Sequence, residues 1–196
     1  MLFKTHQAFG LFSTWLVLIN YTHTPVLSVP GILALGASMI TSVMPDADNP
    51  NTISAKAMLP LAWVLEMTHA KHRGVTHSLL AAACWAWLAL TAVHWRAVLG
   101  PFHFSLYPVA IGAAVGYWSH LVIDLLNKER EQFFWPFKGG VAFYLVSSDG
   151  FVNALLEWVF GIAFFISALY SIALYTPGVA PFFRAAHHLF PLIPLV

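Results

Sequence analysis

Charged residues are scarce in this sequence, and their scarcity decides the class of protein. Only 9% of the 196 residues are Asp, Glu, Lys or Arg, whereas 59% are hydrophobic and 15% are aromatic. With a mean hydropathy of +0.74, the chain lies outside the range of soluble globular domains, so we expect a membrane protein. The net charge of +1 provides no general basic field, which excludes nucleic acid as an expected partner.

Other features are also missing. Cys84 is the one cysteine, so no intramolecular disulfide can form. The first apolar run has no small-residue cleavage site after it, and we interpret it as a retained membrane helix rather than a signal peptide. The sequence contains no internal repeat. It also lacks a His-Glu-x-x-His motif, which disfavours a membrane metalloprotease.

Long uncharged runs predict the membrane helices, because a crossing needs about 20 mostly apolar residues. Five such runs occur, at residues 5–22, 28–44, 74–95, within 97–123 from about Leu106, and from Ser148-Asp149 to about Tyr175. Residues 54–69 are apolar but short and carry Lys56, Pro60 and Glu66, so we expect an interfacial helix there. The predicted fold is all-α: a polytopic integral membrane helical bundle of about five transmembrane helices plus the interfacial helix, in one domain over 1–196.

The positions of lysine and arginine predict the orientation of this bundle. With five crossings, one side receives seven of the nine basic residues, and this side should face the cytoplasm. The seven are Lys4, Lys56, Lys71, Arg73, Lys128, Arg130 and Lys138, and the other two are Arg96 and Arg184. The same topology brings Asp46, Asp48, His77, His120 and Asp124 to one depth, at the cytoplasmic face.

A polar pair in an apolar run is the strongest local sign of a site. His120 and Asp124 are four residues apart, so they project from one face of a predicted helix. Imidazole and carboxylate are ligands of zinc and manganese, and polar groups inside a membrane span are usually functional. We favour a metal site here over a helix-end histidine that merely pairs with a carboxylate.

Further candidate ligands lie at the same depth. Asp46 and Asp48 follow Pro45, a spacing that lets one carboxylate bridge while the other completes the shell, although aspartates after proline are also ordinary turn residues. His6 lies at the start of the first predicted helix. His72 is a candidate as well.

The stretch from His72 to His77 contains a glycine and an arginine between its two histidines. Gly74 permits a bend that turns both histidines toward one centre. Arg73 either binds a phosphate or carboxylate or sets the topology, and both interpretations stay open. Glu157 lies about 12 Å along the last predicted helix, where it is a general base, a partner of a ligand histidine, or a neutral acid.

These motifs resemble the YdjM-like family, described as membrane-bound, metal-dependent hydrolases. The likeness runs from His6 to about Phe137 and rests on Met44-Pro-Asp-Ala-Asp48, His72-Arg-Gly-Val-Thr-His-Ser-Leu79, Gly116-Tyr-Trp-Ser-His-Leu-Val-Ile-Asp-Leu-Leu126 and Phe134-Trp-Pro-Phe137. It implies a bacterial or archaeal inner-membrane protein. The metal ligands that it implies are His6, Asp46, Asp48, His72, His77, His120 and Asp124. Two departures, Met44 for leucine and Lys128 after the third motif, touch none of them.

The sequence thus predicts a hydrolase with a metal centre. Seven candidate ligands exceed the four of one tetrahedral ion, so we expect one to two divalent ions, zinc first and manganese second, with an aspartate bridging. The expected substrate is a phosphoester or a lipid-linked phosphate at the cytoplasmic leaflet, with Arg73 and Glu157 as candidate catalytic residues. The alternatives are a divalent-metal transporter or non-catalytic metal-binding membrane protein, and a structural module without metal.

Overall fold

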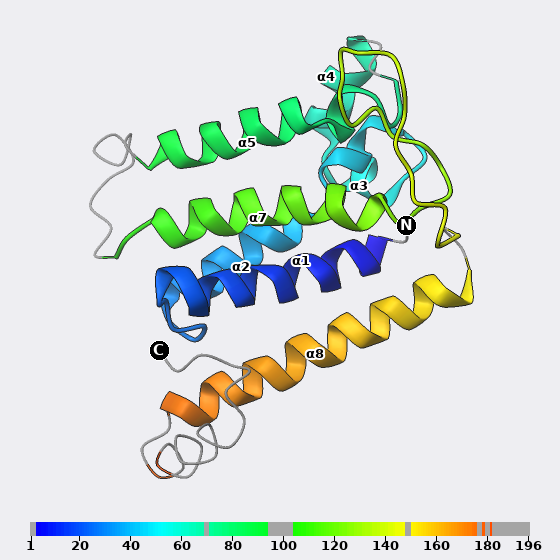
Figure 1. Cartoon of the computed structure of the whole chain (residues 1–196). Coiled ribbons are helices and arrows are strands. Elements are labelled where there is room, and N and C mark those ends of the chain that lie inside the picture. The colour runs from blue at the N-terminus through cyan, green and yellow to red at the C-terminus, as the bar shows by residue number, and fades with distance from the viewer. Residues whose placement is uncertain are drawn as a thin grey trace.

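The computed structural model describes residues 3–68, 71–93, 104–147, 150–175, 178 and 181. Within these residues the chain forms helices and no β-strand, so the all-α prediction is confirmed (Figure 1). The elements in chain order are α1 (Phe3–Val17), the π-helical turn η1 (Leu18–Thr22), α2 (Val29–Thr41), the 3₁₀ turn η2 (Pro45–Asp48), α3 (Ile53–Ala57), α4 (Leu59–Met67), the 3₁₀ turn η3 (Val75–His77), α5 (Leu79–Ala92), α7 (Tyr107–Asp124) and α8 (Phe151–Tyr175).

Helix α7 is the centre of the bundle. It packs against α1, α2 and α5, while α8 lies along the outer side of α1 (Figure 1). The contact between α1 and α8 includes a hydrogen bond of 2.9 Å from Trp15 Nε1 to Ser171 Oγ, and the rings of Phe9 and Phe160 lie 4.7 Å apart. Because α7 is covered by three neighbours, most residues of its last two turns are buried.

Small residues allow α7 and α2 to approach closely. A Cβ atom added at Gly112 would lie 2.2 Å from the carbonyl oxygen of Ala34, and one at Gly116 would lie 2.3 Å from Thr41 Oγ1. The two glycines are four residues apart, so they form one smooth stripe on α7. This is the small-xxx-small packing by which helices associate in membranes. It fixes the depth of α7 relative to η2, which follows α2.

Polar caps decide where several helices begin. The side-chain oxygens of Ser28, Thr52 and Ser78 each accept a hydrogen bond of 3.1–3.2 Å from a backbone N–H in the first turn of α2, α3 and α5. Helix α5 therefore begins at Leu79, five residues later than the predicted start at residue 74. As a consequence His77 lies in η3, a separate turn, and not in the first turns of a helix.

The predicted interfacial helix at 54–69 is two short helices. Helix α3 ends at Ala57, Met58 leaves the helical region with φ −119° and ψ 48°, and α4 begins at Leu59 with Pro60 in its first turn. Proline lacks the N–H that a continuous helix would use at this position, so the break follows from the sequence. Both helices contact η2.

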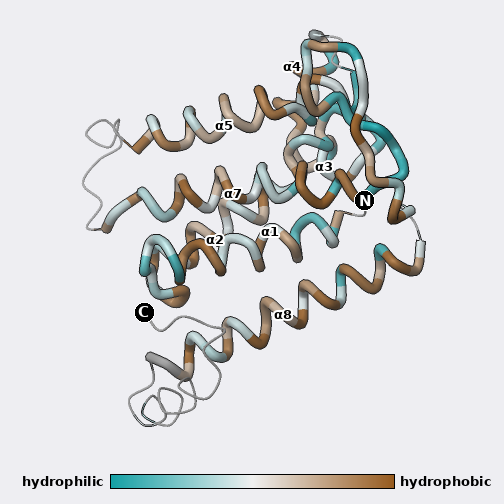
Figure 2. The backbone as a smooth tube through the Cα atoms, in the orientation of Figure 1, coloured by the Kyte–Doolittle hydropathy of each residue, from teal (hydrophilic) through white to brown (hydrophobic). Residues whose placement is uncertain are grey.

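Hydropathy agrees with a membrane location. By length and composition, Val29–Asp48 and Phe151–Ala173 are able to cross a membrane, and Leu79–Ala92 is apolar but shorter. Figure 2 shows that the long helices are mainly hydrophobic and that hydrophilic stretches gather around α3 and in the turn near η1 at the other end. The remaining crossings of the five predicted from the sequence stay a prediction.

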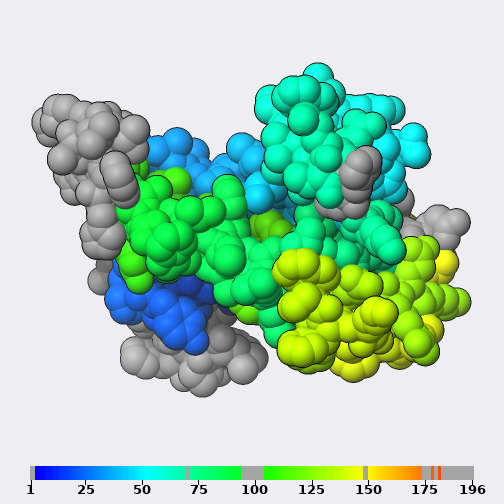
Figure 3. Space-filling model, turned by 90° about the horizontal axis from the view of Figure 1, so that it is seen from above, coloured from blue at the N-terminus to red at the C-terminus, as the bar shows by residue number. Residues whose placement is uncertain are grey.

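An irregular segment over residues 127–147 covers one end of the bundle. Two isolated β-bridges, Asn127 with Val146 and Glu131 with Val141, hold it in shape. The backbone N–H of Leu79 donates to the carbonyl of Phe133 (2.9 Å), which ties the segment to the start of α5. Figure 3 shows that this segment and the α3–α4 segment lie at the same end of the molecule.

Candidate metal centre

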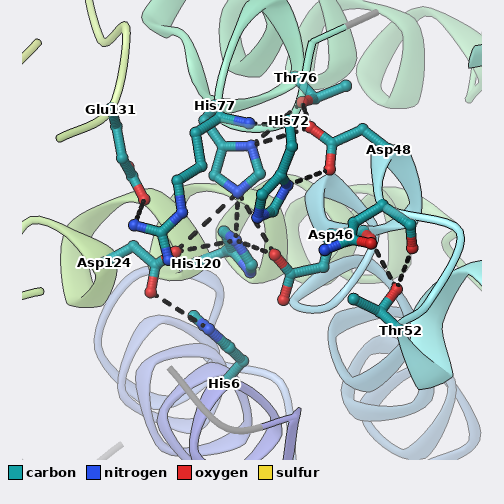
Figure 4. A network of polar contacts seen from close by, with 12 residues as sticks. His6, Asp46, Asp48, Thr52, His72, Thr76, His77, His120, Asp124 and Glu131 are labelled. Carbon is teal, nitrogen blue, oxygen red and sulfur yellow. Dashed lines mark hydrogen bonds and ion pairs between the residues drawn. The ribbon is translucent and has the colours of Figure 1, made fainter. Parts of the chain in front are cut away.

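Four side chains converge where η2, η3 and the end of α7 meet. Asp46, His77, His120 and Asp124 each offer one donor atom, and these atoms all lie within 4.8 Å of one another. Figure 4 shows Asp46 and Asp124 approaching the two imidazole rings from opposite sides. His77, His120 and Asp124 are 0–1% exposed, whereas the side chain of Asp46 is 16% exposed. The set is therefore buried, with access to solvent at Asp46.

The distances among these donors fit a tetrahedral metal ion. His77 Nε2 lies 3.2 Å from His120 Nε2, 3.4 Å from Asp46 Oδ1 and 3.9 Å from Asp124 Oδ2. His120 Nε2 lies 3.7 Å from Asp46 Oδ1 and 3.5 Å from Asp124 Oδ2. Bonds of about 2.1 Å from zinc to nitrogen or oxygen give a tetrahedron with edges of about 3.4 Å. The side chains therefore need to move little to hold such an ion.

Helix α2 fixes the orientation of His120. The Nδ1 atom of His120 lies 2.7 Å from the carbonyl oxygen of Ser42, just beyond the end of α2. A carbonyl only accepts hydrogen bonds, so Nδ1 carries the proton and donates it. The lone pair is then on Nε2, which faces the other three donors. A backbone carbonyl is a common partner for the far nitrogen of a metal-binding histidine.

Asp48 orients His77 in a similar way, by contacting the Nδ1 atom of its ring. Its Oδ2 atom lies 3.4 Å from His77 Nδ1 and accepts hydrogen bonds from Thr76 Oγ1 (2.5 Å) and from the backbone N–H of Arg73 (3.2 Å). Its Oδ1 atom lies 2.7 Å from His72 Nδ1. Asp48 and His72, both predicted as ligands, thus lie outside the set of four donors, with Asp48 on the Nδ1 side of His77 and His72 bound to Asp48.

The carboxylates around His77 also control its protonation. Burial disfavours the charged imidazolium, but the contacts with Asp46 and Asp48 outweigh burial and raise the pKa of His77 to about 10. The imidazole of His77 therefore holds a proton at neutral pH until a cation replaces that proton.

His6 lies on the far side of Asp124. Its ring is fully buried and stacks on His120 with 3.9 Å between the centroids. His6 Nε2 lies 3.3 Å from Asp124 Oδ1, the oxygen opposite the one that faces His77. Neither ring nitrogen of His6 makes a hydrogen bond within the described residues. Asp124 therefore lies between the other three donors and a further imidazole, in the position of a bridging carboxylate.

Glu131 is a site residue that sequence reasoning missed. It belongs to the charged run Lys128-Glu-Arg-Glu131, which indicates a solvated turn, but its side chain is 0% exposed. Burial, and then the charge of Asp124, raise the pKa of Glu131 to about 9, so this carboxyl is neutral near pH 7. No local pattern indicated this, because the bridge between Glu131 and Val141 that turns the side chain inward depends on the fold of 127–147.

Arg73 is held by two glutamates at the edge of the site. Its Nη2 atom lies 3.2 Å from Glu129 Oε2, and its Nη1 atom lies 3.9 Å from Glu131 Oε1. Arg73, and not Gly74, adopts the left-handed conformation, with φ 61°. Gly74 is needed for space instead, because a Cβ there would lie 2.7 Å from the carbonyl oxygen of Lys71. The bend predicted between His72 and His77 is therefore present, and its left-handed residue is Arg73, one position before Gly74.

Glu157 is not brought to this site. It lines a groove between α1 and α8 together with Lys4 and Gln7. No described hydrogen bond or ion pair joins it to the four donors. Ser148 and Asp149, at the predicted start of the last helix, lie outside the described residues.

Fold and site together define a class: a helical bundle with a buried centre of histidines and aspartates that could hold a metal ion. The chain belongs to the YdjM inner membrane protein family, whose model matches residues 1–180. The protein is thus a membrane protein, and the resemblance noted from the motifs is confirmed. No curated protein and no solved structure matches the chain.

Proposed function

We propose that the protein is a metal-dependent hydrolase of the inner membrane, with a site for one or two divalent ions formed by Asp46, His77, His120 and Asp124. The observation that carries the proposal is the further imidazole beside Asp124, that of His6, which lies outside the set of four donors. A structural metal site is closed by four protein donors, whereas a hydrolytic site keeps an open position or uses a second ion. His6, buried and without a hydrogen bond in the described residues, supplies a donor for that second ion.

The chemistry suits the cleavage of an ester bond by water. A divalent ion, when bound, makes a water molecule more acidic and polarises a phosphoryl oxygen. His120 and His77 are held in place by Ser42 and Asp48, so their lone pairs keep one direction. Glu131, neutral near pH 7 and buried beside Asp124, would donate a proton to a leaving oxygen.

A phosphoester is the substrate that the surroundings favour. Arg73 is 12% exposed, and its buried Nε atom has no hydrogen-bond partner within the described residues, so the guanidinium would gain a partner for this donor by turning toward a phosphate oxygen. The donors lie at one end of the bundle, where hydrophilic segments gather (Figure 2). A phosphate at the level of lipid headgroups, in a phospholipid or a lipid-linked phosphate, would reach this end.

We further propose that α1 with η1, α2, α5, α7 and α8 cross the bilayer, with the metal centre on the cytoplasmic side. The excess of lysine and arginine in the segments around this centre supports that orientation. In a Cys84→Ala background, single cysteines at Asn51 and Lys128 should be protected from an impermeant thiol reagent in intact cells. Labelling of Asn51 from outside would reverse the orientation.

The decisive experiment is turnover in nanodiscs. The purified protein, loaded with zinc or manganese, is given a panel of phospholipids and polyprenyl phosphates, and release of phosphate or of a phosphorylated headgroup is measured. His6→Ala should retain one ion and lose about a hundredfold in rate, which corresponds to roughly 3 kcal/mol. Arg73→Ala should lower the rate and retain the metal, with little recovery in Arg73→Lys. His23→Asn, at the opposite end of α1, is the matched control.

Two other outcomes would each contradict the hydrolase. If the metal-loaded protein shows no turnover but accelerates zinc or manganese flux into proteoliposomes, it is a transporter. Protein that holds one ion and does neither has a structural site, the function that a closed set of four protein donors favours. A transport path places polar groups near the middle of the membrane, whereas the donors here lie at one end of α7, so we rank the transporter below the hydrolase.

A further inference from the structure

A groove lies between α1, α2 and α8, away from the metal centre. It encloses about 470 Å³ and is lined mainly by apolar side chains, among them Leu11, Trp158 and Phe165. This volume falls within the range of roughly 300–1,000 Å³ that is usual for sites of small molecules. Gly161 adds to the open space, because a Cβ atom there would meet nothing within 4 Å.

The two charged residues of the groove lie at one end of it. Lys4 is in the first turn of α1 and Glu157 is in the second turn of α8, whereas Leu11 and Phe165 lie about two turns further along each helix. The two helices run in the same direction, since Thr5 contacts Asn153 and Trp15 contacts Ser171. The groove is therefore charged at one end and apolar along its length.

Neither charge has a partner among the described residues. Lys4 and Glu157 both line the groove, yet the described residues contain no ion pair or hydrogen bond that joins the two or satisfies either of them. A half-buried carboxylate at a membrane protein's surface costs free energy unless it has a partner. An occupant that carries both a cation and an anion at one end would complement both residues.

The groove is separate from the proposed catalytic site. His6 is two residues from Lys4, and at about 100° per residue the two side chains leave α1 in nearly opposite directions. His6 contacts Asp124 and His120 on one face, whereas Lys4, Gln7 and Leu11 line the groove on the other.

We propose that this groove binds one phospholipid whose headgroup carries both a phosphate and an ammonium group. The phosphate contacts Lys4, the ammonium contacts Glu157, and one acyl chain lies along Leu11, Ile162 and Phe165. The groove and this headgroup each carry one positive and one negative charge. The site therefore favours this lipid over an anionic one, whose headgroup would leave Glu157 without a partner. The site is distinct from the proposed hydrolysis and does not depend on it.

The test is lipid retention by the full chain. Protein reconstituted with equal amounts of phosphatidylethanolamine and phosphatidylglycerol is extracted in detergent, and native mass spectrometry counts the lipids that remain bound. The wild type should keep one phosphatidylethanolamine in preference to phosphatidylglycerol. Gly161→Trp, which fills the groove, should reduce the bound fraction several-fold, and Glu157→Gln should remove the preference between the two lipids.

Gly36→Trp is the matched control, because Gly36 is also a helical glycine with nothing within 4 Å of its Cβ position, and it lies outside the groove. It should retain lipid as the wild type does. Zinc content measured on the same samples should be unchanged in Gly161→Trp, which shows that this variant is folded. Equal retention by Gly161→Trp and Gly36→Trp would overturn the proposal, as would preferential retention of phosphatidylglycerol by the wild type.

Discussion

The Nε2 atoms of His77 and His120 lie 3.2 Å apart. The far nitrogen of each ring is already engaged, on His120 by the Ser42 carbonyl and on His77 by Asp48 and Thr76. The two Nε2 atoms thus face each other across one small space. In the metal-free protein at neutral pH, the proton on His77 lies between them, because the pKa of His77 is raised to about 10 and Nε2 of His77 can donate to Nε2 of His120. A divalent ion bound by both rings would take the place of that proton.

Removal of one ligand should remove most of the metal. We expect the purified wild type to hold one to two zinc ions. His120→Ala or Asp124→Ala should hold only a small fraction of that amount, because each deletes one of four donors. Elemental analysis by mass spectrometry provides the measurement. His23→Asn is the control, since His23 lies at the other end of α1 with φ 50°, a conformation that asparagine tolerates. Full occupancy in Asp124→Ala would rule out the site as described.

Asp48 should affect affinity rather than stoichiometry. Because its carboxylate positions His77 from behind the ring, Asp48→Asn should weaken zinc binding by about 10–100-fold and still allow full occupancy at high zinc. Asp46→Asn removes a donor and should lower the number of ions bound. Competition with a chelator of known affinity separates the two effects. If Asp48→Asn loses an ion at saturation, Asp48 is a ligand, as first predicted from the sequence.

Zinc affinity should rise with pH. The pKa of His77 is raised to about 10, so below that pH the ring carries a proton that zinc must displace. Each proton released makes the apparent affinity about tenfold stronger per pH unit. Affinity should therefore increase from pH 6 to pH 9 and be lost as the pH falls. Titrations at several pH values test this, and an affinity that does not change with pH would show that His77 is neutral in the metal-free protein.

The close contact of α7 with α2 should be essential for stability. Gly112→Leu places a side chain where a Cβ alone would lie 2.2 Å from the Ala34 carbonyl, so the helices must separate. We expect a loss of more than about 3 kcal/mol, or failure to fold. Gly36→Leu, where the Cβ position is open, should change little. Thermal unfolding in detergent compares the two variants, and equal melting temperatures would contradict the packing described here.

Much of the site could be predicted from the sequence. His120 and Asp124 share a face because a helix repeats every 3.6 residues, and this relation holds in any fold that keeps the helix. The apolar composition required a membrane protein, and Ser28, which caps α2 through a local hydrogen bond, lies at the predicted start of that helix. These features depend on residues a few positions apart.

Only the tertiary structure decided how distant segments of the chain lie relative to one another. Asp48 lies behind His77, Glu131 is buried beside Asp124, and Glu157 faces a groove on the other side of α1. Each depends on how helices pack and on how the irregular segment 127–147 folds over the bundle. Residue type fixes which atoms are able to bind a cation. Only packing fixes which of those atoms come within a few ångströms of one another, because that distance depends on segments far apart in the chain.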